Sequence, residues 1–324
     1  MEKDNSQEIS HLMAEIHATL NNISKNGIDI GDLKLLNTTL KELYEGHVVF
    51  SPYKDKRKVV VFGSARSSQT SPAYLMTEEF SRKISQKDFM VITGGGPGLM
   101  EAANKGAGKE NSFGINIKLP YEQIFNKYID YEHKAIFFKY FFTRKLMFIK
   151  ESHATVIFPG GFGTLNEAIE NINLIQTGKC APRPVVLIEP KGSKYWNHWL
   201  SAIRKTLLNQ GYIGTSDFNL FTYTTDVDVA VETVINFYKN YHSIKRVEHL
   251  TALRLINPLS DEHFLKIKND FKDLFVNGNV RQGNALPEER EFLELPRLIF
   301  EMKEKHYGML LQMIREINRE VHGR

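Results

Sequence analysis

The chain has 324 residues, of which 42% are hydrophobic and 25% are charged, so its composition is that of a globular protein rather than a disordered or fibrous one. The net charge of +4 is spread over interleaved basic and acidic residues, so the sequence does not indicate a nucleic-acid-binding surface. The single cysteine excludes both an intrachain disulfide and a cysteine-based zinc site.

The chain opens with Met-Glu-Lys-Asp-Asn-Ser and lacks the apolar run of a signal peptide. No segment approaches the roughly 20 apolar residues that a membrane-spanning helix needs. We therefore expect a cytoplasmic protein with no membrane partner.

Residues 1–56 predict a helical extension. Apolar side chains such as Ile9, Leu12 and Ile16 recur at three- and four-residue steps, and the pattern resumes from Leu33. The apolar face of such helices must be covered, either by the core domain or by a second subunit.

Residues 57–242 predict the main domain, because short apolar runs alternate there with helical stretches. Helical patterns occupy about 72–86, 99–106, 137–150 and the residues after 164. The apolar runs, which indicate buried parallel strands, are 59–62, 89–92, 113–119, 154–158 and 184–188. This alternation predicts an α/β class, with a Rossmann-like parallel sheet and helices on both faces.

Residues 243–324 carry no clear strand signal. They are rich in Lys, Glu and Leu and are interrupted at Pro258, Pro287 and Pro296. We expect a C-terminal helical extension that serves as an appendage or an oligomerisation element.

Two glycine-rich loops each follow a predicted strand and precede a helix. In a parallel sheet both lie at the carboxyl edge, where α/β folds bind ligands, and glycines let the backbone approach an anion. The alternative is that both loops are tight turns, whose backbone geometry requires glycine and which bind no ligand. The residues that predict a phosphate cradle are Gly160, Gly161, Gly163 and Thr164, with Gly95 and Gly96 on a second wall.

Neither loop matches a dinucleotide or triphosphate motif. Leu99 stands where the third glycine of a Gly-x-Gly-x-x-Gly motif belongs, and no Gly-Lys-Ser/Thr sequence follows either loop. Hydride transfer and nucleoside triphosphate hydrolysis are therefore disfavoured.

Glu167 lies one turn into the helix that follows the second loop. A carboxylate beside a sugar can stabilise an oxocarbenium-like transition state or deprotonate the attacking water. The alternative is structural, since Thr164-Leu-Asn-Glu167 also has the pattern of a capping box.

Three further residues are candidates for ligand contact. Arg144 and Lys145, on an aromatic-rich helix, can clamp a phosphate or a ribose hydroxyl, or they can form a solvated basic edge. Ser64 follows the first strand and can contact phosphate or base, or cap a turn. The histidines show no metal-ligand spacing, so no metal site is expected.

Three strings of the sequence together resemble the LOG family of phosphoribohydrolases and nucleotide 5′-monophosphate nucleosidases, whose members are often labelled lysine decarboxylases. The resemblance covers roughly residues 57–240. The stretch 116–123 is similar to a bacterial subgroup of the family rather than to the plant enzymes that activate cytokinins. The strings that carry the resemblance are Gly94-Gly-Gly-Pro-Gly-Leu-Met100, Phe142-Thr-Arg-Lys145 and Pro159-Gly-Gly-Phe-Gly-Thr-Leu-Asn-Glu167.

The resemblance implies a Rossmann-like homodimer or higher homo-oligomer without a metal or organic cofactor. It implies that Glu167 and Arg144 are catalytic and that the loop 160–164 binds the substrate phosphate. The expected reaction is hydrolysis of the N-glycosidic bond of a nucleoside 5′-monophosphate, AMP among them, to free base and ribose 5-phosphate.

Two other functions stay open at this point. The first is a carrier or sensor of the same fold, which would hold a nucleotide or a nucleotide-like cofactor without cleaving it. The second is pyridoxal-phosphate-dependent lysine decarboxylation, for which Lys145 is the one lysine near the expected pocket.

Overall fold

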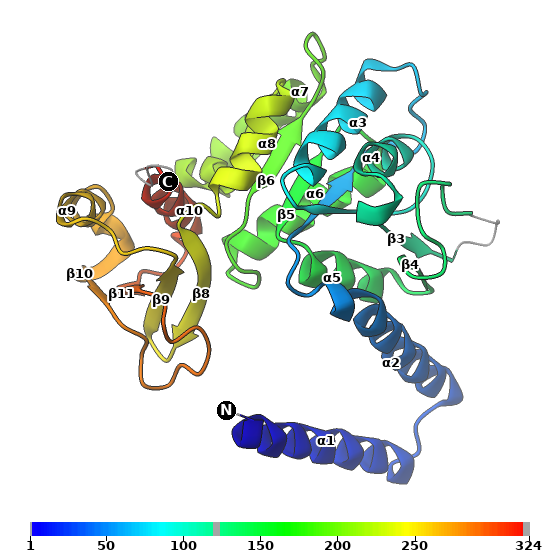
Figure 1. The fold of residues 1–324 in the computed structure, drawn as a ribbon, viewed down its shortest axis with the longest axis horizontal. Helices are drawn as coiled ribbons and strands as arrows, with labels where there is room; N and C mark the ends of the chain where they lie inside the picture. Colours follow the sequence, from blue (N-terminus) through cyan, green and yellow to red (C-terminus); the bar gives the residue numbers. More distant parts are fainter. Residues whose placement is uncertain (1, 119–123, 320–324) are drawn as a thin grey trace. The chain divides into compact units, whose positions relative to one another are not determined.

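The computed structural model describes residues 2–118 and 124–319, and the chain divides after Val48 into two compact units. The first unit contains α1 (Glu2–Lys25) and most of α2 (Ile30–Phe50), which confirms the helical prediction for this segment (Figure 1). Within the described ranges, no helix is both long and apolar enough to cross a membrane.

The second unit is built on a seven-stranded parallel sheet, which confirms the predicted α/β class (Figure 1). Its strand order is β4-β3-β2-β1-β5-β6-β7, so the order reverses beside β1. Every pair of neighbouring strands is parallel. The strands are β1 (Lys58–Phe62), β2 (Met90–Thr93), β3 (Ser112–Ile117), β4 (Ala135–Phe138), β5 (Ala154–Ile157), β6 (Val185–Ile188) and β7 (Thr222–Thr224).

Five of these strands coincide with the predicted apolar runs, and β4 and β7 are additional. β4 overlaps the first two residues of the segment that predicts a single helix over 137–150; the helix itself, α5, begins only at Phe141. β7 has three residues and is too short to show an apolar pattern. The end of the third predicted strand and most of the subgroup stretch fall on residues 119–123, outside the described residues.

Helices cover both faces of the sheet. Val59 and Val61 of β1 pack in a buried cluster with α3, α4 and α8, whereas Phe62 stacks edge-on against Phe148 of α5. Successive residues of a strand point to opposite faces, so these contacts place α5 on the other side. The helices are α3 (Pro72–Ser85), α4 (Leu99–Ala107), α5 (Phe141–Glu151), α6 (Phe162–Gln176), α7 (Tyr195–Ile203) and α8 (Val227–Asn236), with short turns η1 (Ser51–Tyr53), η2 (Lys109–Asn111), η3 (Arg204–Leu208) and η4 (Thr215–Leu220).

The C-terminal segment differs from its prediction, because it forms a four-stranded antiparallel sheet in addition to helices (Figure 1). In β10, half-buried side chains alternate with exposed Asn and Arg, and this dilutes the apolar signal of the strand. The elements are β8 (Tyr241–Val247), β9 (Leu250–Leu255), α9 (Asp261–Asp270), η5 (Lys272–Leu274), β10 (Phe275–Gly283), β11 (Arg297–Met302) and α10 (Tyr307–Ile317).

Candidate functional site

Three loops meet at the carboxyl edge of the parallel sheet, after β1, β2 and β5. The backbone of Ser64 ties them together: its N–H donates to the carbonyl of Pro159 at 3.1 Å, and its carbonyl accepts from the N–H of Leu99 at 2.9 Å. A Cβ at Gly98 would lie 2.4 Å from that carbonyl, so only glycine permits this approach. The predicted meeting of the two glycine-rich loops is therefore confirmed.

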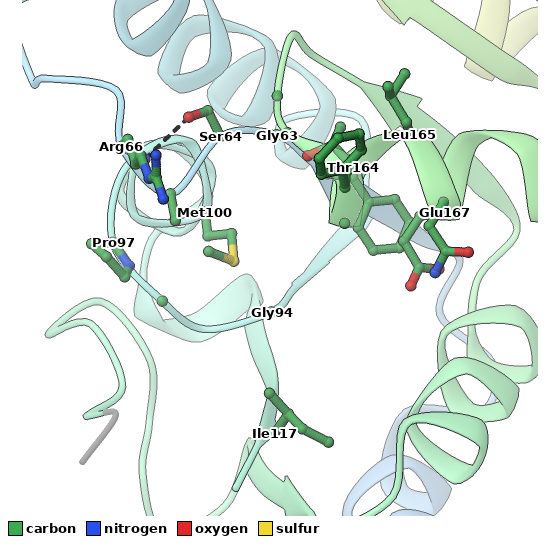
Figure 2. Close-up of a pocket in the computed structure, with 18 of the residues that line it drawn as sticks. Gly63, Ser64, Arg66, Gly94, Pro97, Met100, Ile117, Thr164, Leu165 and Glu167 are labelled. Carbon is green, nitrogen blue, oxygen red and sulfur yellow. Dashed lines mark hydrogen bonds between the residues drawn. The ribbon is translucent and has the colours of Figure 1, made fainter. Parts of the chain in front are cut away.

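These loops enclose a cavity of about 830 Å³ (Figure 2). Two predicted site residues, Gly95 and Lys145, do not line it. Gly95 has φ +75° and packs against Phe125, which is a structural use of glycine. The predicted residues that do line the cavity are Ser64, Gly96, Arg144, Gly160, Gly161, Gly163, Thr164 and Glu167.

The start of α6 is a candidate anion cradle, because its first residues line the cavity and no side chain caps its first N–H groups. A Cβ at Gly160 would lie 2.2 Å from Oγ1 of Thr164, so the close packing of the loop requires glycine there. Gly161 and Gly163 differ: neither has positive φ, and a Cβ on either would meet no atom within 4 Å. Nothing in the chain itself requires glycine at these two positions.

The predicted capping box does not form. α6 begins at Phe162, with Gly161 at the N-cap, and has no side-chain capping hydrogen bond. The helix starts earlier than the box requires, so Thr164 and Glu167 both lie inside it. The Glu167 carboxylate therefore makes no capping hydrogen bond at the start of α6.

Glu167 is a buried carboxyl group that lines the cavity. It is 8% exposed, and its Oε2 atom has no hydrogen-bond partner among the described residues. Burial raises the pKa of Glu167 to about 7; Lys145 and Arg144 lower it, and Glu170 raises it further. A carboxyl group that titrates near neutral pH can exchange protons with a substrate or with water.

Arg144 places its guanidinium at the opposite wall. Its Nε donates to the carbonyl of Ile115 in β3 at 2.8 Å, and a Cβ at Gly94 would lie 2.6 Å from Nη2. Burial lowers the pKa of Arg144 to about 10, while Glu167 opposes the shift, so the side chain stays cationic at neutral pH. Lys145, the next residue, pairs instead with Glu170 at 2.8 Å.

Tyr195 and Asn116 also line the cavity, and neither is among the predicted site residues. Tyr195 of α7 donates its hydroxyl proton to the carbonyl of Gly160 at 2.6 Å and so supports the cradle. No local pattern connects a tyrosine in α7 with a loop 35 residues earlier. Asn116 of β3 lies 1% exposed beside the cavity. A polar residue inside the apolar run Phe113-Gly-Ile-Asn-Ile117 was a signal that could have found it.

Several solved structures are similar to part of this chain. The protein TM1055 is 23% identical, covers 55% of this chain and 98% of its own, and has a TM-score of 0.40. The molybdenum cofactor carrier protein from Chlamydomonas reinhardtii is 23% identical, with coverages of 56% and 96% and a TM-score of 0.38. The molybdenum cofactor binding protein from Rippkaea orientalis is 20% identical, with the same coverages and a TM-score of 0.40.

No curated protein matches the chain. A family model described as "Possible lysine decarboxylase" matches residues 100–234, the segment that contains Arg144, Glu167 and the whole second glycine-rich loop. This match confirms the resemblance that the motifs indicate.

Proposed function

We propose that this protein hydrolyses the N-glycosidic bond of nucleoside 5′-monophosphates and releases a free base and ribose 5-phosphate. The observation that carries the proposal is the buried Glu167 carboxylate, with a free oxygen, in the same cavity as the α6 anion cradle and the Arg144 guanidinium. Phosphate at the cradle brings the ribose to the first turns of α6, where Glu167 lies.

Each step of the reaction uses a group that lines the cavity. Water attacks C1′ of the ribose as the bond to the base nitrogen breaks, and the bonding electrons leave with the base. Glu167 accepts the proton of the attacking water and stabilises the positive charge that develops on the sugar. Arg144 donates to the phosphate or to a ribose hydroxyl. The departing base takes up the proton that Glu167 accepted from the water, which regenerates the carboxylate.

Glycine at positions 161 and 163 is evidence for an anionic ligand that does not depend on the Glu167 carboxylate. Their backbones do not need glycine, and a side chain on either would project into open space. Glycine at both positions keeps that space free, so that a phosphate can approach the N–H groups of α6. Alanine at Gly161 or Gly163 should therefore weaken phosphate binding without destabilising the fold.

Lysine decarboxylation is not supported by the cavity. Pyridoxal phosphate would need a lysine amine to hold it as a Schiff base, and the described residues that line the cavity include no lysine. Lys145, the one candidate in the sequence, is engaged by Glu170. The residues present therefore do not fit that cofactor.

The test is base release from a panel of nucleoside monophosphates, followed by chromatography, with the natural protein and the variants Glu167→Ala and Glu101→Gln. Glu101 is a matched control, because it follows the lining residue Met100 but does not line the cavity. We expect release by the natural protein and by Glu101→Gln, and none by Glu167→Ala. Equal turnover by Glu167→Ala would overturn the mechanism.

The same experiment separates hydrolysis from carriage. A carrier or sensor would bind the nucleotide and return it intact, so folded protein that releases no base from any member of the panel would overturn the hydrolase proposal. We further propose a homo-oligomer that works in the cytoplasm. Sedimentation analysis and cell fractionation test these two points.

A further inference from the structure

Asn116 places an unused hydrogen-bond donor beside the cavity. Its Oδ1 accepts from the N–H of Ile117 at 2.8 Å. A backbone N–H can only donate, so this contact establishes which amide atom is the oxygen and leaves Nδ2 on the other side. Nδ2 is buried and has no partner among the described residues, although the Asn116 side chain lines the cavity.

A buried amide without a partner lowers the stability of the folded protein, because its hydrogen bonds to water are lost and not replaced. Asn104 also has an unpartnered Nδ2, but it does not line the cavity, and its Oδ1 accepts from Thr93 and Asn126. Of these two described amides, Asn116 is the one whose free donor coincides with a space that a ligand can fill. This coincidence indicates an acceptor atom on the ligand.

The position of Asn116 in the sheet indicates which part of the ligand carries that acceptor. The cradle follows β5, and the order β3-β2-β1-β5 puts three strand spacings of about 4.8 Å, roughly 14 Å, between it and β3. Ribose 5-phosphate is shorter than that width, so of the parts of a nucleoside monophosphate held at the cradle, the attached base is the one that can reach Asn116. Met100 and Ile117 lie across the cavity from Thr164 and offer apolar surface that suits an aromatic ring (Figure 2).

We propose that Asn116 binds the nucleobase of the substrate, by donating a hydrogen bond from Nδ2 to a ring nitrogen or carbonyl oxygen of the base. The inference rests on the proposed function and adds to it a residue that recognises the leaving group. The same hydrogen bond stabilises the negative charge that develops on the base as its bond to ribose breaks.

The experiment compares a ligand that has the base with one that lacks it. Calorimetry measures the affinities of a nucleoside monophosphate and of ribose 5-phosphate for Glu167→Gln protein, in which the substrate is not consumed, with and without Asn116→Ala. Asn116→Leu is measured in parallel, because it keeps the size of the side chain and removes the donor without adding a charge. Asn104→Ala serves as the control from outside the cavity.

We expect both Asn116 variants to lose roughly five- to tenfold in affinity for the nucleoside monophosphate and less than twofold for ribose 5-phosphate. The melting temperature of Asn116→Ala should not fall by more than that of Asn104→Ala, which loses two hydrogen bonds. Equal losses for the two ligands would place the contact on the sugar or phosphate and overturn the inference, as would no loss for either. Absence of binding of both ligands to Glu167→Gln protein would overturn the proposed function itself.

Discussion

Two buried glutamates in the second unit differ in the hydrogen bonds that their carboxylates accept. Glu289, in the C-terminal segment, is 4% exposed and accepts hydrogen bonds from Arg254, Arg297 and the N–H of Leu286. Glu167, in the parallel-sheet domain, is 8% exposed, and its Oε2 has no partner among the residues that the structure describes. The exposed fractions of the two side chains are similar, and their hydrogen-bond partners differ.

The pKa values of the two carboxyl groups move in opposite directions. Burial alone would raise both, and at Glu167 it does raise the pKa, to about 7. At Glu289 the hydrogen bonds from Arg297, Leu286 and Arg254 outweigh burial and lower the pKa. A carboxylate that is fully paired stabilises the fold, whereas one that is left unpaired beside a cavity is available for chemistry.

The largest expected effect is the loss of activity in Glu167→Gln. Removing the group that accepts the proton should lower kcat by roughly 10²- to 10⁴-fold. The melting temperature should stay the same or rise, since the variant removes a buried ionisable group that lacks full pairing. Steady-state kinetics and thermal unfolding on the same preparation measure both quantities. A large fall in melting temperature would show that Glu167 is structural, like Glu289.

The converse change, Glu289→Gln, should act on stability. It leaves Arg297 buried without its counter-charge and leaves Arg254 with only the longer pair to Glu291 at 3.8 Å, which costs about 3–5 kcal/mol in the free energy of unfolding. The kcat of the protein that remains folded should stay near that of the natural protein. Urea denaturation measures the free energy. A change below about 1 kcal/mol would mean that the arginine cluster is not needed for folding.

The pH dependence of stability should differ in sign between the two sites. Because the pKa of Glu167 is raised in the folded state, the stability that it contributes is complete below its ordinary value of 4.5 and is lost as the pH rises towards 7. Glu289, with a lowered pKa, contributes stability above 4.5 that is lost as the pH falls below that value. Thermal unfolding of each Gln variant against the natural protein, from pH 4 to pH 8, measures the two slopes. If the difference in melting temperature between Glu167→Gln and the natural protein did not vary with pH, the raised pKa of Glu167 would be contradicted.

The smallest expected effect is that of Tyr195→Phe, which removes one hydrogen bond to the carbonyl of Gly160. The cradle should bind phosphate less well, and KM should rise by roughly two- to tenfold with kcat within twofold. Tyr223→Phe, which removes a hydrogen bond to Glu189 away from the cavity lining, is the matched control. Equal KM changes in both variants would indicate a general loss of packing.

Much of the site could be predicted because its signals are local. Apolar runs of four to six residues mark β1, β2, β3, β5 and β6, and parallel strands bring the loops that follow them to one edge. The motif around Glu167 and the Arg144-Lys145 pair lie within single helices. Which of the two basic residues faces the cavity was not predictable, since it depends on Ile115 and Glu170 from other elements.

The sequence by itself determined the α/β class, the edge of the sheet where the cavity lies and the identity of Glu167 and Arg144 as candidates, because spacing and residue type carry that information. The tertiary structure alone decided the antiparallel sheet of the C-terminal segment, the unpartnered amide of Asn116 and the opposite pKa shifts of Glu167 and Glu289. These features depend on burial and on hydrogen-bond partners that come from distant parts of the chain. The energy of a buried polar group is set by those partners and not by its neighbours in sequence.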